Sequence, residues 1–461
     1  MTDQQTQTKP RGRVRRILKW GFRITAVLVL VLALIFVVVF HNALYNRFIR
    51  FPRETAALEE IRAARVAPEL DDGWNEYRGV CHSHSEFSHD CEVPFEDILA
   101  VLKASERDFI CMSDHCHEGK ADYGVQWKGL KDGVLFVRGY EMKYGFMPWG
   151  LPDDVVLNCN EEPEVLARRI AAHGGLLFFA HTEEEREWYL PELVGMEIYN
   201  IHTDFKDEDI MDLAPDLLMN FGAYPDLTFR LIFDRQTDII ERWDKLNWTR
   251  DIVGIAANDC HQNNGIRMYW TEDEKLYIEN TSGEEGDTHE VGAMLKLLLR
   301  VAFGPLEPGR MLFHFQPDPY GVMVRYVATH VLARELAEPA LLDSLEEGRV
   351  FVAFDMLADA RGFVFLAEDG GKRAVMGEAL PFTDSVQLRA AAPNDCRFIV
   401  KRAGETVHTA EGRAFDWRPE EPGKYRVEAE LNILGEWVPW IYANPLELTA
   451  PEEDSAQEAA A

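Results

Sequence analysis

Histidines and acidic residues stand at the ends of several strand-like segments in the middle of this 461-residue chain. Most of them directly follow an apolar run. Neutral imidazole and carboxylate groups are the ligands that divalent zinc, manganese and iron accept. A single histidine beside an apolar segment is commonly a core residue, but packing alone is a poor explanation for so many. The pattern therefore predicts a site for several metal ions. The candidate ligands are His82, His84, His89, Asp90, Asp114, His115, Glu141, His181, Asp259 and His261.

Strand-like and helix-like segments alternate through the region that carries these candidates. This alternation is typical of an α/β fold with a parallel sheet, closed or open. In such folds the active site lies beyond the carboxyl ends of the strands, so we expect the candidate ligands to converge there. The strand-like segments that end at a candidate are YRGVCHSHS, DFICMSDH, VLFVRGYEM, GLLFFAH and IVGIAANDCH.

The first fifty residues predict a membrane anchor. A strongly basic segment precedes an apolar run from Ile24 to Phe40, which is near the short limit for a helix that crosses a bilayer. No small-residue cleavage site follows, which favours an uncleaved anchor over a signal peptide. The far flank carries fewer basic residues (Arg47, Arg50 and Arg53), so we expect a single-pass protein with a cytoplasmic N-terminus. The remainder would be extracytoplasmic, in the periplasm of a Gram-negative cell.

The rest of the chain changes character along its length. Residues 1–50 are predicted to be the basic tail and transmembrane anchor, and residues 51–75 a charged helical spacer. The α/β region follows over 76–358. Short β-like segments separated by Gly, Pro, Asn and Asp predict a small antiparallel β-sandwich over 359–450, for which we expect a structural role. The acidic, Ala-rich end, 451–461, is expected to be disordered.

Charge and cysteine content limit the function further. The net charge of −31 argues against nucleic acid as a bulk partner, because such binding depends on phosphate neutralisation by Lys and Arg. A phosphate site would need positive charge from metal ions. The seven cysteines are too few and too irregular for a disulfide framework. Cys81, Cys116 and Cys260 each adjoin a candidate ligand, so strand alternation should turn them to the opposite face as small buried hydrophobes.

The order of the motifs resembles the polymerase and histidinol phosphatase (PHP) superfamily over roughly residues 76–358. The matching motifs are HSHSEFSHD, SDH, Gly-x-Glu ending at Glu141, Ala-His ending at His181, and Asp-x-His from Asp259 to His261. The resemblance implies a distorted (β/α)7 barrel that holds two or three divalent ions (Zn, Mn or Fe) and hydrolyses phosphoesters. A small phosphorylated molecule would be the substrate. The oligomeric state is not indicated.

The resemblance also implies a role for each ligand. Glu141 would bridge two ions, and Glu141, Asp259 and His181 would form the catalytic set. Asp114 is expected to orient His115. One ligand of the third ion stays open between His89 and Asp90, with Asp90 preferred. The three ions would be held by His82, His84 and Asp259, by Glu141 and His181, and by His115, His261 and His89 or Asp90.

One departure from the family pattern concerns the second ion. Many members carry a further His on the strand after the bridging Glu, where this chain has Asn158 or Asn160. An amide is a weak ligand for zinc, and His202 is a possible substitute. Lys143 and Arg267 lie near ligands in sequence and are candidate phosphate clamps, although a solvated charge is the simpler interpretation.

Two alternatives stay open. The amidohydrolase family also begins with His-x-His and ends with a late Asp, but it does not call for SDH or for a His two residues after that Asp. A non-catalytic, membrane-tethered metal-binding protein on the same scaffold is the other alternative. The incomplete second site at Asn158 is its sole support.

Overall fold

The computed structural model describes residues 11–283 and 285–450. The chain divides into two compact units. The first contains the described residues up to Arg53 together with Asp209–Leu231. The second contains Glu54–Glu208 and the described residues from Ile232 onward. The predicted disordered tail, 451–461, lies outside the described residues.

The first unit is dominated by α1 (Arg11–Tyr45), which continues through a π-helical turn, Asn46–Arg50, into α2 (Phe51–Ala63). Its most apolar stretch has a mean hydropathy of 3.0 and is not buried against other parts of the protein. By length and composition this is a helix that could cross a membrane, although a signal sequence has the same properties. Two short helices, α6 (Ile210–Asn220) and α7 (Pro225–Phe229), complete the unit. Asn46 Nδ2 donates a hydrogen bond of 3.0 Å to Asp216 Oδ1.

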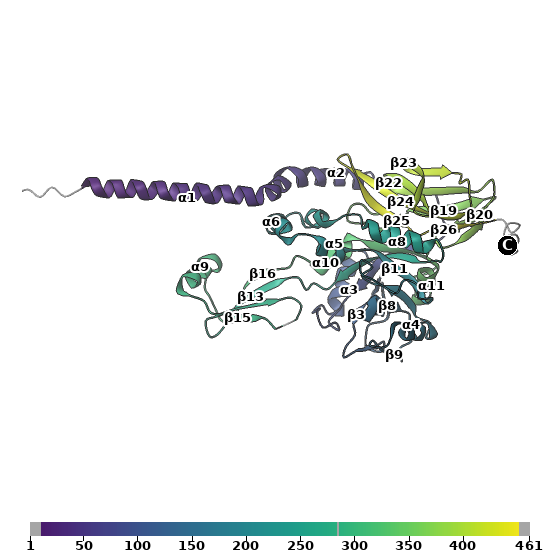
Figure 1. Ribbon diagram of the computed structural model, residues 1–461, viewed down its shortest axis with the longest axis horizontal. Helices are drawn as coiled ribbons and strands as arrows, with labels where there is room; N and C mark the ends of the chain where they lie inside the picture. The colour runs from purple at the N-terminus through teal and green to yellow at the C-terminus, as the bar shows by residue number, and fades with distance from the viewer. Residues whose placement is uncertain (1–10, 284, 451–461) are drawn as a thin grey trace, which may run out of the picture. The chain divides into compact units, whose positions relative to one another are not determined.

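The second unit is an α/β fold built on a series of mainly parallel strands (Figure 1). Neighbouring strands pair in parallel from β6 through β2, β1, β12 and β11 to β10, and β8 pairs antiparallel with β10. An isolated bridge between Gly139, just past β6, and Trp149, at the end of β8, links the two ends of the series. The bounds are β1 Asn75–Ser83, β2 Phe109–Cys111, β6 Val134–Val137, β8 Phe146–Trp149, β10 Leu176–Phe179, β11 Leu193–Asn200 and β12 Val253–Cys260.

Helices pack beside these strands, and their sequences explain where they begin and end. In α3, Pro94 stands at the N-cap, Glu96 and Asp97 occupy the first turn and Lys103 the last, which matches the helix dipole. In α4, Pro163 occupies the first turn. The remaining bounds are α3 Phe95–Ala104, α4 Pro163–Ala172, α5 Ile201–Asp207, α8 Thr237–Asn247, α10 Tyr320–Tyr326 and α11 Glu338–Glu347.

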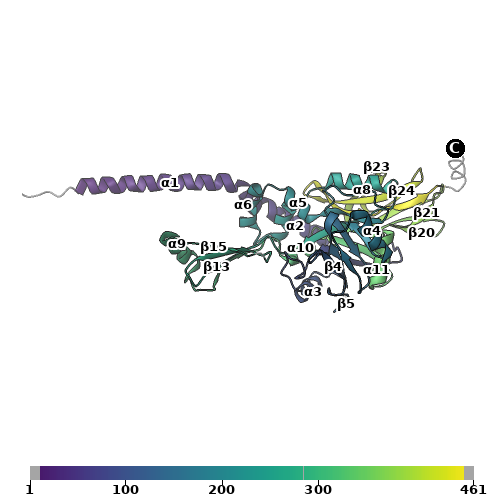
Figure 2. The ribbon, with the colours of Figure 1, turned by 60° about the horizontal axis from the view of Figure 1, so that its bottom comes forward.

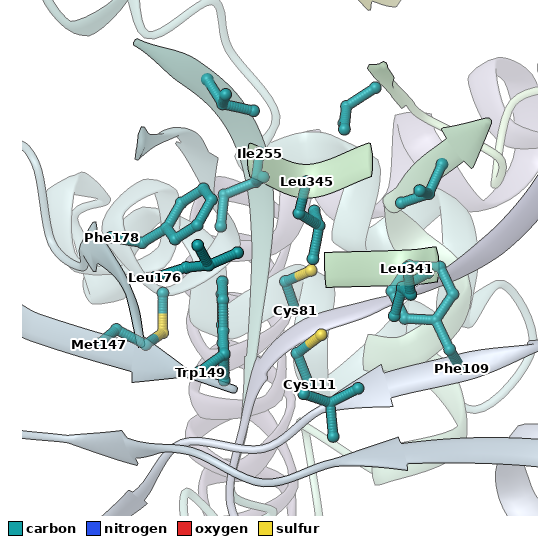
Figure 3. Close-up of a cluster of buried hydrophobic side chains, with 14 of the residues drawn as sticks. Cys81, Phe109, Cys111, Met147, Trp149, Leu176, Phe178, Ile255, Leu341 and Leu345 are labelled. Atoms are coloured by element: carbon teal, nitrogen blue, oxygen red, sulfur yellow. The ribbon is translucent and has the colours of Figure 1, made fainter. Parts of the chain in front are cut away.

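The core of the second unit lies among these strands (Figure 3). Side chains from β1, β2, β8, β10 and β12 point toward one another in a cluster with Leu341 and Leu345 of α11. Members alternate along a strand, as with Phe109 and Cys111 on β2, because successive side chains point to opposite faces. Cys81 belongs to this cluster and directly precedes His82. Apolar packing therefore fixes the position of a strand such as β1 as far as the residue before its candidate ligand.

The C-terminal strands do not form a separate sheet. β17 (Ala328–Ala333) pairs with β1 and β18 (Val350–Ala353), and β18 pairs with β25 through Phe351 and Ala443. Within the described residues these strands join one mixed sheet of 18 strands, in place of the small isolated sandwich that the sequence suggested. Alternation within a strand does not reveal its partner, which explains the difference. The strands are β19 Val364–Asp369, β20 Lys372–Val375, β21 Ala379–Pro381, β22 Gln387–Arg402, β23 Glu405–Trp417, β24 Gly423–Ile433, β25 Glu436–Ala443 and β26 Leu446–Thr449.

An arm extends from the strand series between β12 and β17 (Figures 1 and 2). It consists of a four-stranded antiparallel sheet in the order β15-β14-β13-β16 and of helix α9. Its elements are β13 Ile266–Trp270, β14 Leu276–Asn280, β15 Asp287–His289, α9 Ala293–Phe303 and β16 Met311–Phe315.

Short strand pairs outside the arm also belong to the second unit. They are β3 Asp114–His115 with β7 Tyr140–Glu141, β4 Lys120–Asp122 with β9 Val156–Asn158, and β5 Gly129–Lys131 with β6.

Candidate metal centre

The candidate ligands from separate strands converge at the carboxyl ends of the parallel series. His82 lies at the end of β1, Glu141 on β7, His181 just after β10, and Asp259 near the end of β12. Within each of three groups the ligand atoms all lie within 4.8 Å of one another. The groups are His84, Asp90, His115 and His261; His82, His84 and Glu141; and His82, His181 and Asp259.

The backbone turns sharply at three of these residues. His82, His181 and Asp259 have φ angles of 59°, 49° and 46°, in the left-handed region that non-glycine residues seldom adopt. The pairing of β1 with β12 also shifts register between Cys81 and Ser83. Such local distortions re-aim side chains at the end of a strand and persist only where the surrounding structure holds them. Here they turn the three ligand-type side chains toward a common point.

Glu141 lies at the centre of the cluster and offers its two oxygens to different histidines. Its Oε2 is 3.4 Å from His82 Nε2, and its Oε1 is 3.1 Å from His181 Nε2. Asp259 behaves similarly, with Oδ1 3.3 Å from His82 Nε2 and Oδ2 3.7 Å from His181 Nε2. Two carboxylates that each face two imidazoles are well placed to be shared between neighbouring ions.

The third group contains Asp90 and not His89. Asp90 Oδ2 lies 3.6 Å from His115 Nε2 and 3.4 Å from His261 Nε2. The rings of His84 and His261 are stacked, with centroids 3.7 Å apart. The ring of His89 stands 5.0 Å from that of His115 and belongs to none of the three groups.

Several of these atoms are buried and have no hydrogen-bond partner among the described residues. Leaving a buried polar atom unsatisfied costs about 1–3 kcal/mol. So many unsatisfied atoms facing one another are best explained by a ligand common to all of them. Imidazole nitrogens together with carboxylate oxygens suit Zn, Mn or Fe, so the residues fit divalent ions. The unpartnered atoms are His82 Nε2, His84 Nε2, His261 Nε2, Asp90 Oδ1 and Asp259 Oδ1.

The close packing of imidazoles and carboxylates shifts the pKa values of several candidate ligands. Burial would raise the pKa of Glu141 and of Asp259, but the adjacent His82 holds both well below the usual range. Burial would lower the pKa of His181, but hydrogen bonding to Glu141 raises it to about 11. Burial and the neighbouring His261 lower the pKa of His84. Metal binding needs neutral imidazoles, so binding of an ion here would be coupled to proton release.

Glu197, on β11, orients two of the ligand-type histidines. Its Oε1 accepts a hydrogen bond of 2.5 Å from His82 Nδ1, and its Oε2 accepts one of 2.8 Å from the backbone N–H of His181. Asn200 Nδ2 donates to the same Oε2. Glu197 is not among the candidate ligands that the sequence suggested. Its signal is a lone acidic residue within an otherwise uncharged strand.

Asp114 contacts different groups from those expected. The sequence predicted that it orients His115. Its carboxylate instead accepts hydrogen bonds of 2.6 Å from the backbone of Ser85 and from Gln126 Nε2. It also accepts one of 3.3 Å from Ser88 Oγ, which in turn bonds His84 Nδ1. Neighbouring residues on a strand point to opposite faces, so Asp114 turns away from His115 and acts on the loop after β1.

Asn158 and His202 both lie outside the three ligand groups, but His202 is at the edge of the cluster. The strand after Glu141 in the series is β8, whereas Asn158 lies on β9, is exposed, and accepts a hydrogen bond from the backbone of Asn160. His202, at the start of α5, has Nδ1 3.9 Å from Asp259 Oδ2. Its ring centroid is 5.9 Å from that of His181.

The two suggested phosphate clamps have other contacts. Arg267 forms ion pairs with Glu92 at 2.8 Å and with Glu279 at 3.5 Å, so acidic side chains neutralise its charge. Lys143 Nζ lies 5.0 Å from the ring centroid of Tyr144. Neither side chain belongs to the ligand groups. Glu183, which the sequence did not suggest, does lie next to a candidate ligand. Its Oε1 is 3.7 Å from His181 Nδ1.

The prediction for Cys116 was wrong. It forms a disulfide with Cys159 rather than packing as an isolated hydrophobe. The bond joins the residue after His115 to the residue after β9, across 43 positions of sequence. Spacing alone did not reveal the pair, since the two cysteines meet only when β9 folds back on β4. Cys81 and Cys260 are buried and free, as expected.

Comparison with known proteins adds little. No protein-family model matches the sequence, and no curated protein matches it. A solved structure from Bacteroides vulgatus, a two-domain protein containing a predicted PHP-like metal-dependent phosphoesterase, aligns with 83% of this chain and 98% of its own. The identity is 13% and the TM-score is 0.35.

Proposed function

We propose that this protein is a PHP-type metal-dependent phosphoesterase that acts on a small phosphorylated substrate. One observation carries the proposal. Buried ligand atoms from separate strands face one another without hydrogen-bond partners in the described part of the chain, and Glu141 stands between them. The order of motifs in the sequence supports the family assignment. The series of parallel strands, linked at its ends by the Gly139–Trp149 bridge, supports a distorted (β/α)7 barrel.

In this proposal the ligand groups take the roles that the motifs imply. His82, His84 and Asp259 hold one ion, Glu141 bridges it to a second ion at His181, and the third group holds another. Divalent ions at these positions would lower the pKa of a bound water and offset negative charge on the phosphoryl group. His202 borders the second position. The third ion would be held by His115, His261 and Asp90, which share one group with His84.

The protein's own residues supply positioning. Glu197 holds the ring of His82 by Nδ1, so that Nε2 faces Glu141 and Asp259. Ser88 holds His84 by Nδ1 in the same way, so that its Nε2 faces Asp259. Histidine ligands are commonly fixed through their second nitrogen by such groups, which sets the tautomer and the direction of the lone pair.

We also propose that α1 anchors the protein in a membrane, with the N-terminus in the cytoplasm and the catalytic region in the periplasm. The basic flank before the apolar run supports this orientation. The Cys116–Cys159 disulfide supports an oxidising compartment, since such bonds are rare in the cytosol.

The test uses the full chain, purified in detergent without chelators. Elemental analysis should find at least two divalent ions per chain, and a panel of phosphomonoesters and diesters should contain a substrate. Glu141→Gln should abolish hydrolysis, because a neutral amide is a poor bridge between cations. Glu164→Gln, on the exposed face of α4, is the matched control and should retain activity. Bound metal without hydrolysis of any ester would favour the non-catalytic alternative. Hydrolysis of amides or lactones alone would favour the amidohydrolase alternative.

A further inference from the structure

Helix α9, at the end of the arm, is apolar on two sides. Its inner side packs on the arm's sheet, where Leu299 is buried with Trp270, Leu276 and Leu312. In both views the helix lies at the end of the arm that is remote from the strand series (Figures 1 and 2). The inner contacts account for the folding of the arm. They do not involve the side chains on the opposite side of the helix.

That opposite side is a stripe of large exposed hydrophobic residues. Met294, Leu297, Leu298 and Val301 are 79%, 63%, 57% and 78% exposed. They follow one another at the i, i+3, i+4, i+7 spacing that places side chains on one face of a helix. Single exposed hydrophobic residues are ordinary on protein surfaces, but a continuous stripe marks an interaction site.

The charges on α9 are all positive. Within the helix they are Lys296 and Arg300, one turn apart, and acidic residues are absent from this described segment. Lys296 Nζ pairs with Glu274 at 2.7 Å and lies 5.5 Å from the Trp270 ring centroid, so it lies on the side of the helix that faces the sheet. Arg300 is exposed and stands next to the stripe, one turn after Lys296. An exposed apolar stripe with a basic side chain beside it is typical of helices that lie in a membrane interface.

The size of the stripe favours lipid over a second protein chain. At 11 residues, α9 is about 16 Å long and roughly 10 Å wide. Its footprint is far below the ~800 Å² per partner that a stable protein interface requires. Insertion into lipid has no such minimum. The same chain carries a helix that could cross a membrane, which would keep a bilayer at high effective concentration.

We propose that α9 inserts this stripe into the interface of a lipid bilayer, as a second membrane contact of the chain. The inference rests on the proposed anchor and is independent of the proposed phosphoesterase activity. Arg300 would extend toward the headgroups while Leu297, Leu298 and Val301 enter the acyl region. The arm would then be held against the bilayer rather than surrounded by water.

The test places an environment-sensitive fluorophore on the full chain. Val301→Cys is labelled with NBD and reconstituted into phosphatidylcholine–phosphatidylglycerol vesicles with or without lipids that carry a nitroxide quencher on the acyl chain. Thr288→Cys, exposed on β15 of the same arm, is the matched control. The native cysteines outside the disulfide are buried, and the unsubstituted chain labelled in parallel gives the background.

We expect blue-shifted emission at position 301 and several-fold stronger quenching there than at position 288. Adding Leu297→Ser and Leu298→Ser should reduce that quenching. Equal, weak quenching at both positions would overturn the proposal. So would pyrene excimer emission from labelled Val301→Cys without quenching, because it would identify a second copy as the partner. Flotation of the unlabelled chain with vesicles reports the anchor separately: flotation without quenching at 301 would reject α9 insertion and keep the anchor.

Discussion

Glu197 joins two ligand-type histidines, because it accepts the Nδ1–H of His82 at 2.5 Å and the backbone N–H of His181 at 2.8 Å. Both histidines have left-handed backbone conformations, so one buried carboxylate helps to hold two distorted strand ends. This contact fixes the direction of the His82 Nε2 lone pair. It therefore links the β11 strand to the geometry of the proposed metal site.

We expect Glu197→Gln to weaken metal binding by 10- to 100-fold, the usual effect of removing an outer partner of a histidine ligand. The amide has the shape of the carboxylate but loses its charge and one acceptor. Metal affinity is measured by competition with a fluorescent chelator. Glu164→Gln on α4 is the control and should bind as the unsubstituted chain does. Unchanged affinity in Glu197→Gln would show that Glu197 serves folding alone.

His202, rather than Asn158, should influence the second ion. His202→Ala should raise the Mn²⁺ concentration needed for half-maximal activity by about tenfold, because an imidazole near Asp259 is lost. Asn158→Ala should have no effect, since Asn158 is exposed on β9. The measurement is a Mn²⁺ titration of hydrolysis in each variant. If only the Asn158 variant needed a different Mn²⁺ concentration for half-maximal activity, Asn158 and not His202 would be the residue that influences the second ion.

The buried His330 should make stability depend on pH. It lies between Glu76, 2.6 Å from Nδ1, and Asp355, 3.4 Å from Nε2. Burial opposes its protonation, but these carboxylates raise its pKa to about 9. Because the folded pKa exceeds the unfolded value of about 6.5, the stabilisation is complete below pH ~6.5 and is lost as the pH rises through about 9.

His330→Gln should accordingly destabilise the protein by roughly 3 kcal/mol at pH 6, since it removes the cation from a buried charge pair. The difference in unfolding free energy between the two proteins should narrow by pH 10. Urea denaturation followed by tryptophan fluorescence measures both values. A difference that stays constant across this range would mean that His330 is neutral in the folded protein.

The disulfide predicts a defined count of reactive thiols. After denaturation without reductant, maleimide should label five cysteines, and after reduction it should label all seven. The double variant Cys116→Ser, Cys159→Ser should give five under both conditions. Seven labels without reductant in protein isolated from its membrane would contradict both the bond and the oxidising compartment.

Topology is tested by a reporter joined to the C-terminus. Alkaline phosphatase fused after Ala461 should be active, because it folds only outside the cytoplasm, and a β-galactosidase fusion should be inactive. The basic flank before Ile24 is the physical reason. The opposite pattern of activity would reverse the proposed orientation.

The sequence alone was enough to suggest which residues could bind metal ions. His82, Glu141 and Asp259 stand directly after apolar runs, and the periodicity of those runs is a local property of the chain. The apolar helix before residue 50 is also local, because its length and composition can be read without knowledge of packing. The α/β character follows from the alternation of short strand-like and helical segments.

Tertiary structure decided which groups meet. Strand pairing puts Asn158 on β9, and the direction of its side chain turns Asp114 toward Ser85 and Gln126. The sequence distance of these residues from Glu141 does not reveal either contact. Glu197 reaches His82 across 115 positions of sequence, and Cys116 meets Cys159 only once β4 and β9 pair. The β18–β25 pairing merges the C-terminal strands with the rest. Contacts between distant segments depend on the register and twist of the whole sheet, so local sequence patterns do not specify them.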